Sequence, residues 1–268
     1  MQNNYNSVRR WIEDLPKRGR ITFSLKEAEE SLPYASKKAI QSSIYKLKIK
    51  GRICSVWRSF YVIVPDEYAL KGTVPPIEYI DYLMAHLGYK YYIGLLSAAA
   101  IYGAGHQQPQ ILTVISNNND IRSNNDTIHF MSKNVIPTEH LIVKNAGYGK
   151  VVLSSPELTA IDLVCYESRI GGLNRVAEII NEMSLDFNKT DVGLWQLYKT
   201  PVVQRLGYIM ESILGCEKNG EVIYQKAQLA GLRFRKSLLA PNVKQSSSKL
   251  LINEKWRIII NCDLEIEE

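Results

Sequence analysis

The residues best suited to chemistry form one basic stretch near the N-terminus. Residues 36–51 read SKKAIQSSIYKLKIKG, with five lysines and no acidic residue. Glutamine bonds bidentately to adenine and lysine reaches the acceptors of guanine, so Gln41 and Lys38 are predicted to read DNA bases. Ser42 and Tyr45 are predicted to touch bases or backbone. The remaining cations are predicted to contact phosphates, which position a protein without specifying sequence: Lys37, Lys46, Lys48, Lys50, Arg52 and Arg58.

A second pattern, Asp263-x-Glu265-x-Glu267, is suited to an enzyme. On a strand these carboxylates share one face, and paired carboxylates hold Mg²⁺ for phosphoryl or nucleotidyl transfer. Such a site also needs a phosphate-binding loop, and the chain has no GxxxxGK[ST] or GxGxxG. It also lacks HExxH and GxSxG, and its histidines are not at metal-ligand spacing. No catalytic residue, metal or cofactor is therefore predicted. A metal-dependent nucleic-acid-processing enzyme remains the alternative function.

Charge is concentrated in the same part of the chain as the lysines. Residues 1–72 hold 14 Lys/Arg and 7 Asp/Glu, whereas residues 73–268 hold 19 and 20. The net charge of +6 therefore comes from the first quarter of the chain. A small basic region joined to a larger neutral one is typical of a nucleic-acid reader attached to another domain.

The basic stretch is predicted to be the second helix of a helix-turn-helix. Apolar residues at 8, 11, 12 and 15 predict a helix over residues 7–15. Ser24 and Glu27 form a capping box that opens a brief helix, which ends at Leu32-Pro33. Ser36 is the predicted N-cap of a longer helix that ends before Gly51.

A hairpin is predicted directly after the basic helix. Two β-rich runs, 53–57 and 60–64, flank Arg58-Ser59. A hairpin in this position is a wing, and Arg58 at its tip would lie over a phosphate or reach into the minor groove. Residues 1–70 are therefore predicted to be a winged helix-turn-helix DNA-binding domain. A winged helix that binds another protein is the competing interpretation.

The rest of the chain is predicted to be a linker and a larger domain. Residues 71–76 (KGTVPP) carry a glycine and two prolines and form the predicted linker. Residues 77–268 are predicted to be a mixed domain with helices at 77–87, 92–103, 154–165, 174–183 and 202–214, and strands at 110–116, 127–131, 140–144, 256–260 and 263–266. The predicted fold class is α+β.

The cellular compartment is predicted from the N-terminus, the apolar runs and the cysteines. The N-terminus has no apolar signal core, and the longest weakly polar run, 92–105, is too short to span a bilayer. The four cysteines lie far apart, which favours a reducing cytoplasm. Cys165 is predicted to be a buried, unreactive residue, since no histidine lies near it in sequence.

Several segments of the larger region resemble one known family. The most specific is Tyr91–Gln110, YYIGLLSAAAIYGAGHQQPQ. Others follow in order: 155–164 (SPELTAIDLV), 171–176 (GGLNRV), 205–208 (RLGY) and 255–261 (KWRIIIN). Together they resemble the AbiEi antitoxins of type IV toxin–antitoxin systems, which act in bacterial abortive infection and phage defence.

The resemblance implies a function for each part of the chain. The N-terminal winged helix would repress transcription of its own operon by binding inverted repeats in the operator DNA. The C-terminal domain would be the antitoxin domain and would counteract a nucleotidyltransferase-like toxin. The type IV scheme does not require the two proteins to form a stable complex. The family supplies no catalytic motif for this chain, so a non-enzymatic protein is expected.

Overall fold

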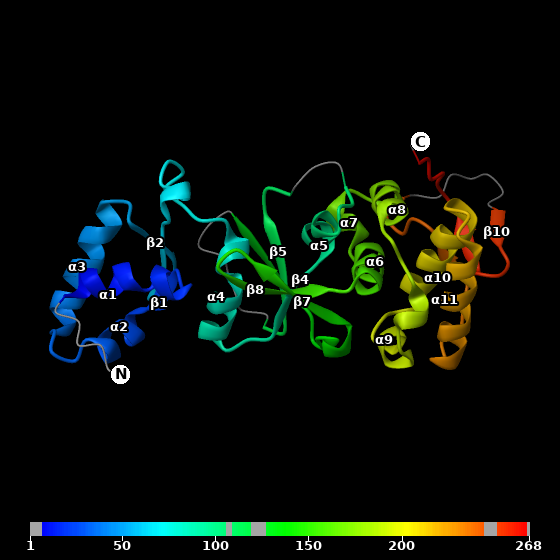
Figure 1. Ribbon diagram of the computed structural model, residues 1–268. Helices are drawn as coiled ribbons and strands as arrows, with labels where there is room; N and C mark the ends of the chain where they lie inside the picture. The colour runs from blue at the N-terminus through cyan, green and yellow to red at the C-terminus, as the bar shows by residue number, and fades with distance from the viewer. Residues whose placement is uncertain (1–6, 106–108, 119–126, 244–250, 267–268) are drawn as a thin grey trace. The chain divides into compact units, whose positions relative to one another are not determined.

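The computed structural model describes residues 7–105, 109–118, 127–243 and 251–266. The chain forms two compact units. Figure 1 labels their helices and strands. The first unit comprises Met1–Tyr92, Val114–Ile136 and Val143–Val152, and the second comprises Ile93–Thr113, Pro137–Ile142 and Leu153–Glu268. The chain combines helices with strands, which confirms the α+β prediction.

The N-terminal part of the first unit contains three helices and a small antiparallel sheet. The helices are α1 (Val8–Asp14), α2 (Leu25–Ser31) and α3 (Lys37–Ile49). The strands β1 (Thr22–Ser24), β2 (Ile53–Trp57) and β3 (Phe60–Ile63) form a sheet of order β1-β3-β2. The three helices and the strands β2 and β3 lie within a few residues of their predicted positions.

Serine caps begin the three helices. The hydroxyl oxygens of Ser7, Ser24 and Ser36 each accept a hydrogen bond from a backbone N–H in the first turn, at 3.1 to 3.2 Å. The predicted capping box is only half formed, because the Glu27 carboxylate binds the Arg20 guanidinium at 2.6 and 2.9 Å. A full positive charge is a stronger partner for Glu27 than the N-cap amide.

Aromatic rings fill the core of this N-terminal part. Phe23 is fully buried and packs edge-on against Trp11, with ring centroids 5.4 Å apart. Its other side stacks on Tyr61 at 5.3 Å. Ile40 and Ile44 are the buried residues of α3 and cover the same core. Their burial fixes which face of α3 points outward.

A five-stranded sheet follows helix α4 (Ile80–Leu87). Its order is β6-β5-β4-β8-β7, with β4 (Tyr91–Ile93), β5 (Leu112–Ser116), β6 (Ile128–Ser132), β7 (Leu141–Ala146) and β8 (Gly149–Ser154). Strands β5, β6 and β7 were predicted, whereas β4 and β8 were not. The helix predicted over 92–103 is shorter, α5 (Leu95–Ile101), because residues 91–93 belong to β4.

The predicted linker lies inside the first unit. The Tyr148 N–H donates to the Glu78 carboxylate at 3.0 Å, and the Tyr148 hydroxyl bonds Glu67 at 3.2 Å. Residues on both sides of the linker are therefore tied to the turn between β7 and β8. Gly147 permits this approach, because a Cβ there would lie 2.7 Å from a Glu78 oxygen. The domain boundaries at 70 and 77 remain a prediction.

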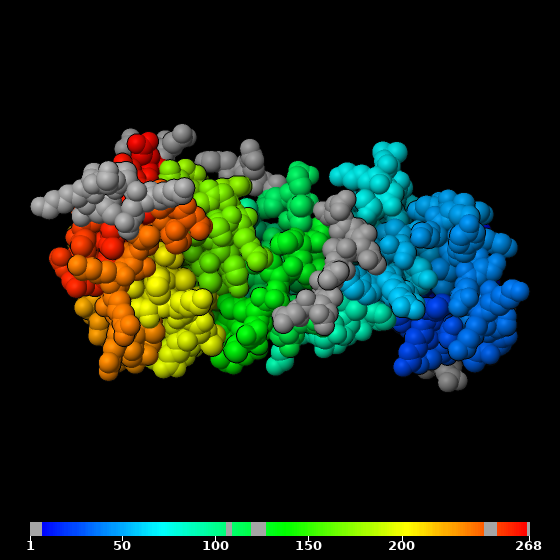
Figure 2. Space-filling view, turned by 180° about the vertical axis from the view of Figure 1, so that it is seen from behind, coloured from blue at the N-terminus to red at the C-terminus, as the bar shows by residue number. Residues whose placement is uncertain are grey.

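The second unit is mostly helical. Besides α5 it contains α6 (Pro156–Cys165), α7 (Glu167–Ile170), α8 (Leu173–Glu182), α9 (Val192–Gln196), α10 (Thr200–Tyr208) and α11 (Glu217–Leu229). A π-helical turn, Ile209–Ile213, continues α10. Helices α10 and α11 pack side by side, as the yellow and orange surfaces of Figure 2 show. No helix in the described parts of the chain is long and apolar enough to cross a membrane.

A three-stranded sheet packs against these helices near the C-terminus. Strand β11 (Ile258–Ile260) lies between β10 (Leu251–Asn253) and β9 (Ser237–Leu238). The strand predicted over 263–266 is absent. The Asn261 side chain bonds the backbone N and O of Ala240, at 3.0 and 2.8 Å. These two hydrogen bonds replace backbone pairing at the end of β11. Beyond this point the chain leaves the sheet.

Candidate nucleic-acid interface

Helix α3 carries most of the residues predicted to bind DNA. All ten predicted residues are exposed, including Arg52 and Arg58 beyond the helix. At about 100° per residue, Lys38 and Ser42 lie opposite the buried Ile40 and Ile44. Gln41 and Tyr45 both lie next to Lys38 and Ser42 on one side of them, and they also point away from the core. These four residues (Lys38, Gln41, Ser42 and Tyr45) form the outer face of α3.

Helix α3 has four lysines and no acidic residue, so the helix itself is positively charged. Lys37 is paired with Glu29 of α2 at 3.3 Å. Lys38, Lys46 and Lys48 form no ion pair with any carboxylate that the structure describes. Lys37 and Lys38 also occupy the first turn, where the helix dipole is positive and each cation costs about 0.3–1 kcal/mol. The helix keeps its positive charge despite this cost, which suits a polyanionic partner.

A basic groove runs between α1 and the C-terminal half of α3. Its volume is about 540 Å³ and it is lined by Arg9, Glu13, Ser43, Lys46, Leu47, Lys50 and Arg52. The sequence predicted three of these as phosphate contacts: Lys46, Lys50 and Arg52. Arg9 was missed, although its position on the exposed side of the first predicted helix was a signal. Its guanidinium binds Glu13 at 2.7 Å.

The hairpin formed by β2 and β3 is short for a wing. Phe60 at the start of β3 is paired with Ser24, the last residue of β1, so only the two-residue tip extends past the sheet. Arg58 is exposed at this tip. Its neighbour Trp57 packs edge-on against Phe130, with centroids 6.1 Å apart. The tip is therefore anchored within the first unit, and Arg58 reaches outward only by the length of its side chain.

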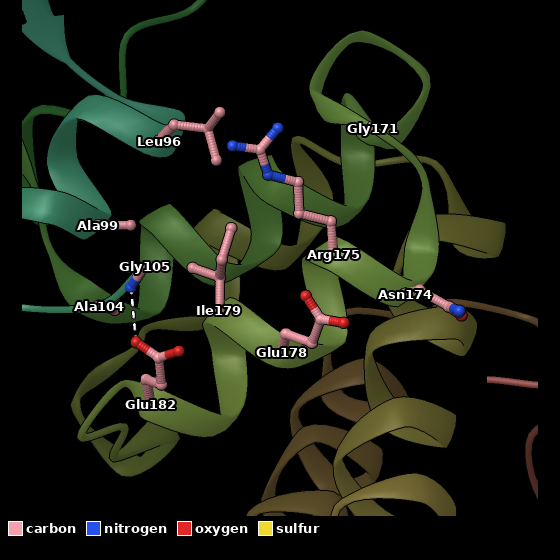
Figure 3. Close-up of a pocket in the computed structure, with 10 residues that line it drawn as sticks. All are labelled: Leu96, Ala99, Ala104, Gly105, Gly171, Asn174, Arg175, Glu178, Ile179 and Glu182. Carbon is pink, nitrogen blue, oxygen red and sulfur yellow. Dashed lines mark hydrogen bonds between the residues drawn. The ribbon is translucent and has the colours of Figure 1, made fainter. Parts of the chain in front are cut away.

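The second unit contains a pocket of about 440 Å³ (Figure 3). Leu96 and Ala99 of α5 line one wall, and Arg175 and Glu178 of α8 line the other. The Gly105 N–H donates to Glu182 at 2.6 Å and joins the two walls. Two segments that carry the family resemblance, 91–110 and 171–176, meet here. The polar side chains of the described lining are those of Asn174, Arg175, Glu178 and Glu182.

The residues considered for metal or acid–base chemistry do not converge. Asp263 and Glu265 are exposed and outside any strand, and Glu267 lies outside the described residues. In the described chain no group of three His, Cys, Asp or Glu residues is placed to hold a metal ion. Cys165 was predicted to be buried but is exposed, because it is the last residue of α6 and lies past the helix's buried stripe.

His140 is the one histidine buried beside an acid in the described chain. It is 8% exposed, and its Nε2 lies 2.6 Å from Asp191 Oδ2. Burial opposes ionisation of Asp191, but hydrogen bonds from the Leu194 N–H and from His140 outweigh it and lower the pKa of this carboxyl group. The same carboxylate caps α9, accepting from Leu194 N at 2.9 Å. The pair therefore fixes two elements of the second unit.

Comparison with known proteins supports part of this description. Residues 92–212 match the family model of the AbiEi antitoxin C-terminal domain. The crystal structure of the RV2827C protein from Mycobacterium tuberculosis is similar in fold, with a TM-score of 0.63 and 12% sequence identity. The similarity covers 94% of this chain and 90% of that one. No curated protein matches. At this identity the structural likeness shows the fold alone.

Proposed function

Since residues 92–212 match the AbiEi antitoxin C-terminal domain, we propose that the protein is both an antitoxin and the repressor of its own operon. Residues 1–70 are the proposed winged helix-turn-helix, 71–76 the linker and 77–268 the antitoxin domain. The N-terminal domain binds inverted repeats in the operator. The antitoxin domain opposes a nucleotidyltransferase-like toxin of a type IV system in the cytoplasm, without catalysing a reaction.

The outer face of α3 is the observation that carries the DNA-binding half of this proposal. The helix has no acidic residue, and its core contacts leave Lys38, Gln41, Ser42 and Tyr45 exposed together. The preceding α2 and the following hairpin supply the element order of a winged helix. A helix with this face fits the major groove, and the groove lined by Lys46 and Lys50 would take the neighbouring phosphates.

The operator half of the proposal is tested by DNA binding at two salt concentrations. The purified protein is titrated against a duplex from upstream of its own gene and against a scrambled duplex. With about 6 phosphate contacts, we expect the affinity to fall roughly a thousandfold between 50 and 200 mM salt. Salt-insensitive binding, or equal affinity for both duplexes, would mean that α3 does not read an operator.

Two variants separate base reading from phosphate contact. Gln41→Ala should weaken operator binding by about 1–3 kcal/mol and random DNA much less, if Gln41 pairs with a base. Lys48→Ala should weaken both duplexes about equally. Similar losses for the two variants on the two duplexes would contradict this assignment of roles.

The antitoxin half is tested in cells that express the toxin encoded beside this gene. Residues 77–268 carry the proposed antitoxin domain, but the full chain is used because Tyr148 ties Glu67 to the larger region. A full-length protein with Lys38→Glu and Gln41→Ala should lose repression and retain neutralisation of the toxin. Joint loss of both activities in a folded variant would show that the two functions are not divided between the two parts.

A further inference from the structure

The basic face of α3 contains two large exposed side chains with apolar surface. Tyr45 is 64% exposed and Ile49 is 69% exposed. They are four residues apart, so their side chains lie one above the other along the helix. Ile49 is turned about 180° from Ile40, the centre of the buried face. It therefore contributes nothing to the protein core, although an isoleucine in water is unfavourable.

The positive charge around Tyr45 and Ile49 limits which kinds of molecule can bind over them. Lys38, Lys46, Lys48 and Lys50 lie on the same helix or directly after it, and α3 has no carboxylate. A second copy docked through the same face would bring like charges together, which costs several kcal/mol. A polyanion is the complementary partner, and the pair must then contact an apolar group on that polyanion.

Double-stranded DNA presents one apolar group in its major groove, the C5-methyl of thymine. Resting on the DNA binding proposed above, we propose that Ile49, supported by Tyr45, recognises thymine methyl groups in the operator. Ile49 is thus a specificity-determining residue on a helix whose other groove-facing residues are polar. Gln41 recognises adenine by hydrogen bonds, and Ile49 recognises thymine by apolar contact.

The helix geometry sets the distance between the two contacts. Gln41 and Ile49 are eight residues apart, which corresponds to about 12 Å along the helix axis. Base pairs are spaced about 3.4 Å apart, so a helix lying along the groove places the two contacts three to four base pairs from each other. Each half-site is therefore expected to contain an adenine and a thymine at roughly this separation.

Replacing thymine by deoxyuridine tests the proposal, because only the methyl group is removed. Each thymine of the operator duplex is replaced in turn, and binding is measured for wild type, Ile49→Ala and Leu70→Ala. Leu70 is fully exposed outside α3 and is the matched control. For wild type and Leu70→Ala we expect a loss of about fourfold at one or two positions in each half-site. For Ile49→Ala the same replacements should have no further effect.

Each other outcome contradicts a defined part of the reasoning. If the protein binds the operator but no replacement weakens binding, methyl recognition is wrong and the proposed repressor function stands. If the sensitive positions remain sensitive in Ile49→Ala, another residue reads the methyl. If no operator is bound, both proposals fail. If Ile49→Ala instead changes the sedimentation of the free protein, the pair covers a protein contact.

Discussion

Gly207 is the second-to-last residue of α10 and packs against the indole of Trp256. A Cβ at Gly207 would lie 2.0 Å from Trp256 Cζ3 and 2.1 Å from Cη2. Carbon atoms in contact are normally about 3.5–4.0 Å apart, so the indole would have to move by about 1.5 Å. Gly207→Ala is therefore expected to displace this ring rather than fill a space.

The surroundings of Trp256 prevent that movement. The residue is fully buried, and its ring centroid lies 5.7 Å from the ring centroids of both Tyr224 and Phe234. Its backbone O accepts from Gln204 Nε2 at 2.7 Å, and its indole N–H donates to Glu211 at 3.2 Å. The ring has no alternative position that keeps these contacts.

These contacts set the size of the effect. Displacing a buried tryptophan costs up to about 3–5 kcal/mol, the range for its truncation, and alanine returns about 1 kcal/mol in helix propensity. Gly207→Ala should therefore lower the free energy of unfolding of the second unit by about 2–4 kcal/mol. Urea denaturation followed by far-ultraviolet circular dichroism measures this change.

A double-mutant cycle supplies the control. In a Trp256→Leu background the obstruction is gone, so Gly207→Ala should be neutral or stabilising by up to about 1 kcal/mol. A coupling free energy of about 3 kcal/mol is expected between the two sites. If Gly207→Ala is harmless in the wild-type chain, the close packing of the Trp256 indole against Gly207 is wrong.

Charged groups at three places in the chain can be tested by substitution. Lys38→Glu should stabilise α3 by about 0.6–2 kcal/mol, because it removes an unfavourable cation from the first turn and adds a favourable carboxylate, while weakening operator binding more than tenfold; thermal melts and titrations must move in opposite directions. Asp191→Asn keeps the cap on α9 but loses the charge beside His140. Because the folded pKa of Asp191 is lowered, its stabilisation is fully present above the ordinary Asp pKa of about 4 and is lost as the pH falls through the lower folded value. Denaturation at pH 7 should therefore show a gap of less than about 1 kcal/mol between wild type and Asp191→Asn, because Asp191 is largely exposed, and this gap should begin to narrow at pH 3.5. Asp263→Ala with Glu265→Ala should leave toxin neutralisation intact in cells; loss of neutralisation by a folded double variant would revive the metal-dependent enzyme.

Local signals predicted the N-terminal region well because its elements are specified by neighbouring residues. Ser36 and Gly51 bracket α3, and helical periodicity placed Ile40 and Ile44 inside. The outward direction of Gln41 followed from the same periodicity. Helix faces depend on spacing of three and four residues, which a sequence displays directly.

Pairing between distant segments could not be predicted in the same way. Strand β4 was taken for part of a helix because small residues follow it, but Ile93 pairs with Leu153 of β8, sixty residues later. Glu27 was expected to return to its own helix and instead binds Arg20. Arg9 became part of the basic groove only because α1 packs against α3. In each case the structure depends on a partner residue that lies outside the stretch of sequence used for the prediction.

Many residues of the segments that carry the family resemblance are buried and pack in the core. Tyr92, Leu158, Gly207 and Trp256 are buried, and the Trp256 indole fills the space that a side chain at Gly207 would need. A buried residue specifies packing and does not meet a toxin or its substrate. Arg175 differs, because it is exposed, faces the pocket of the second unit and forms no ion pair with the described residues. Packing therefore accounts for most of the resemblance but not for Arg175. The chemistry of the proposed antitoxin domain is to be sought among its exposed polar residues rather than in the buried core.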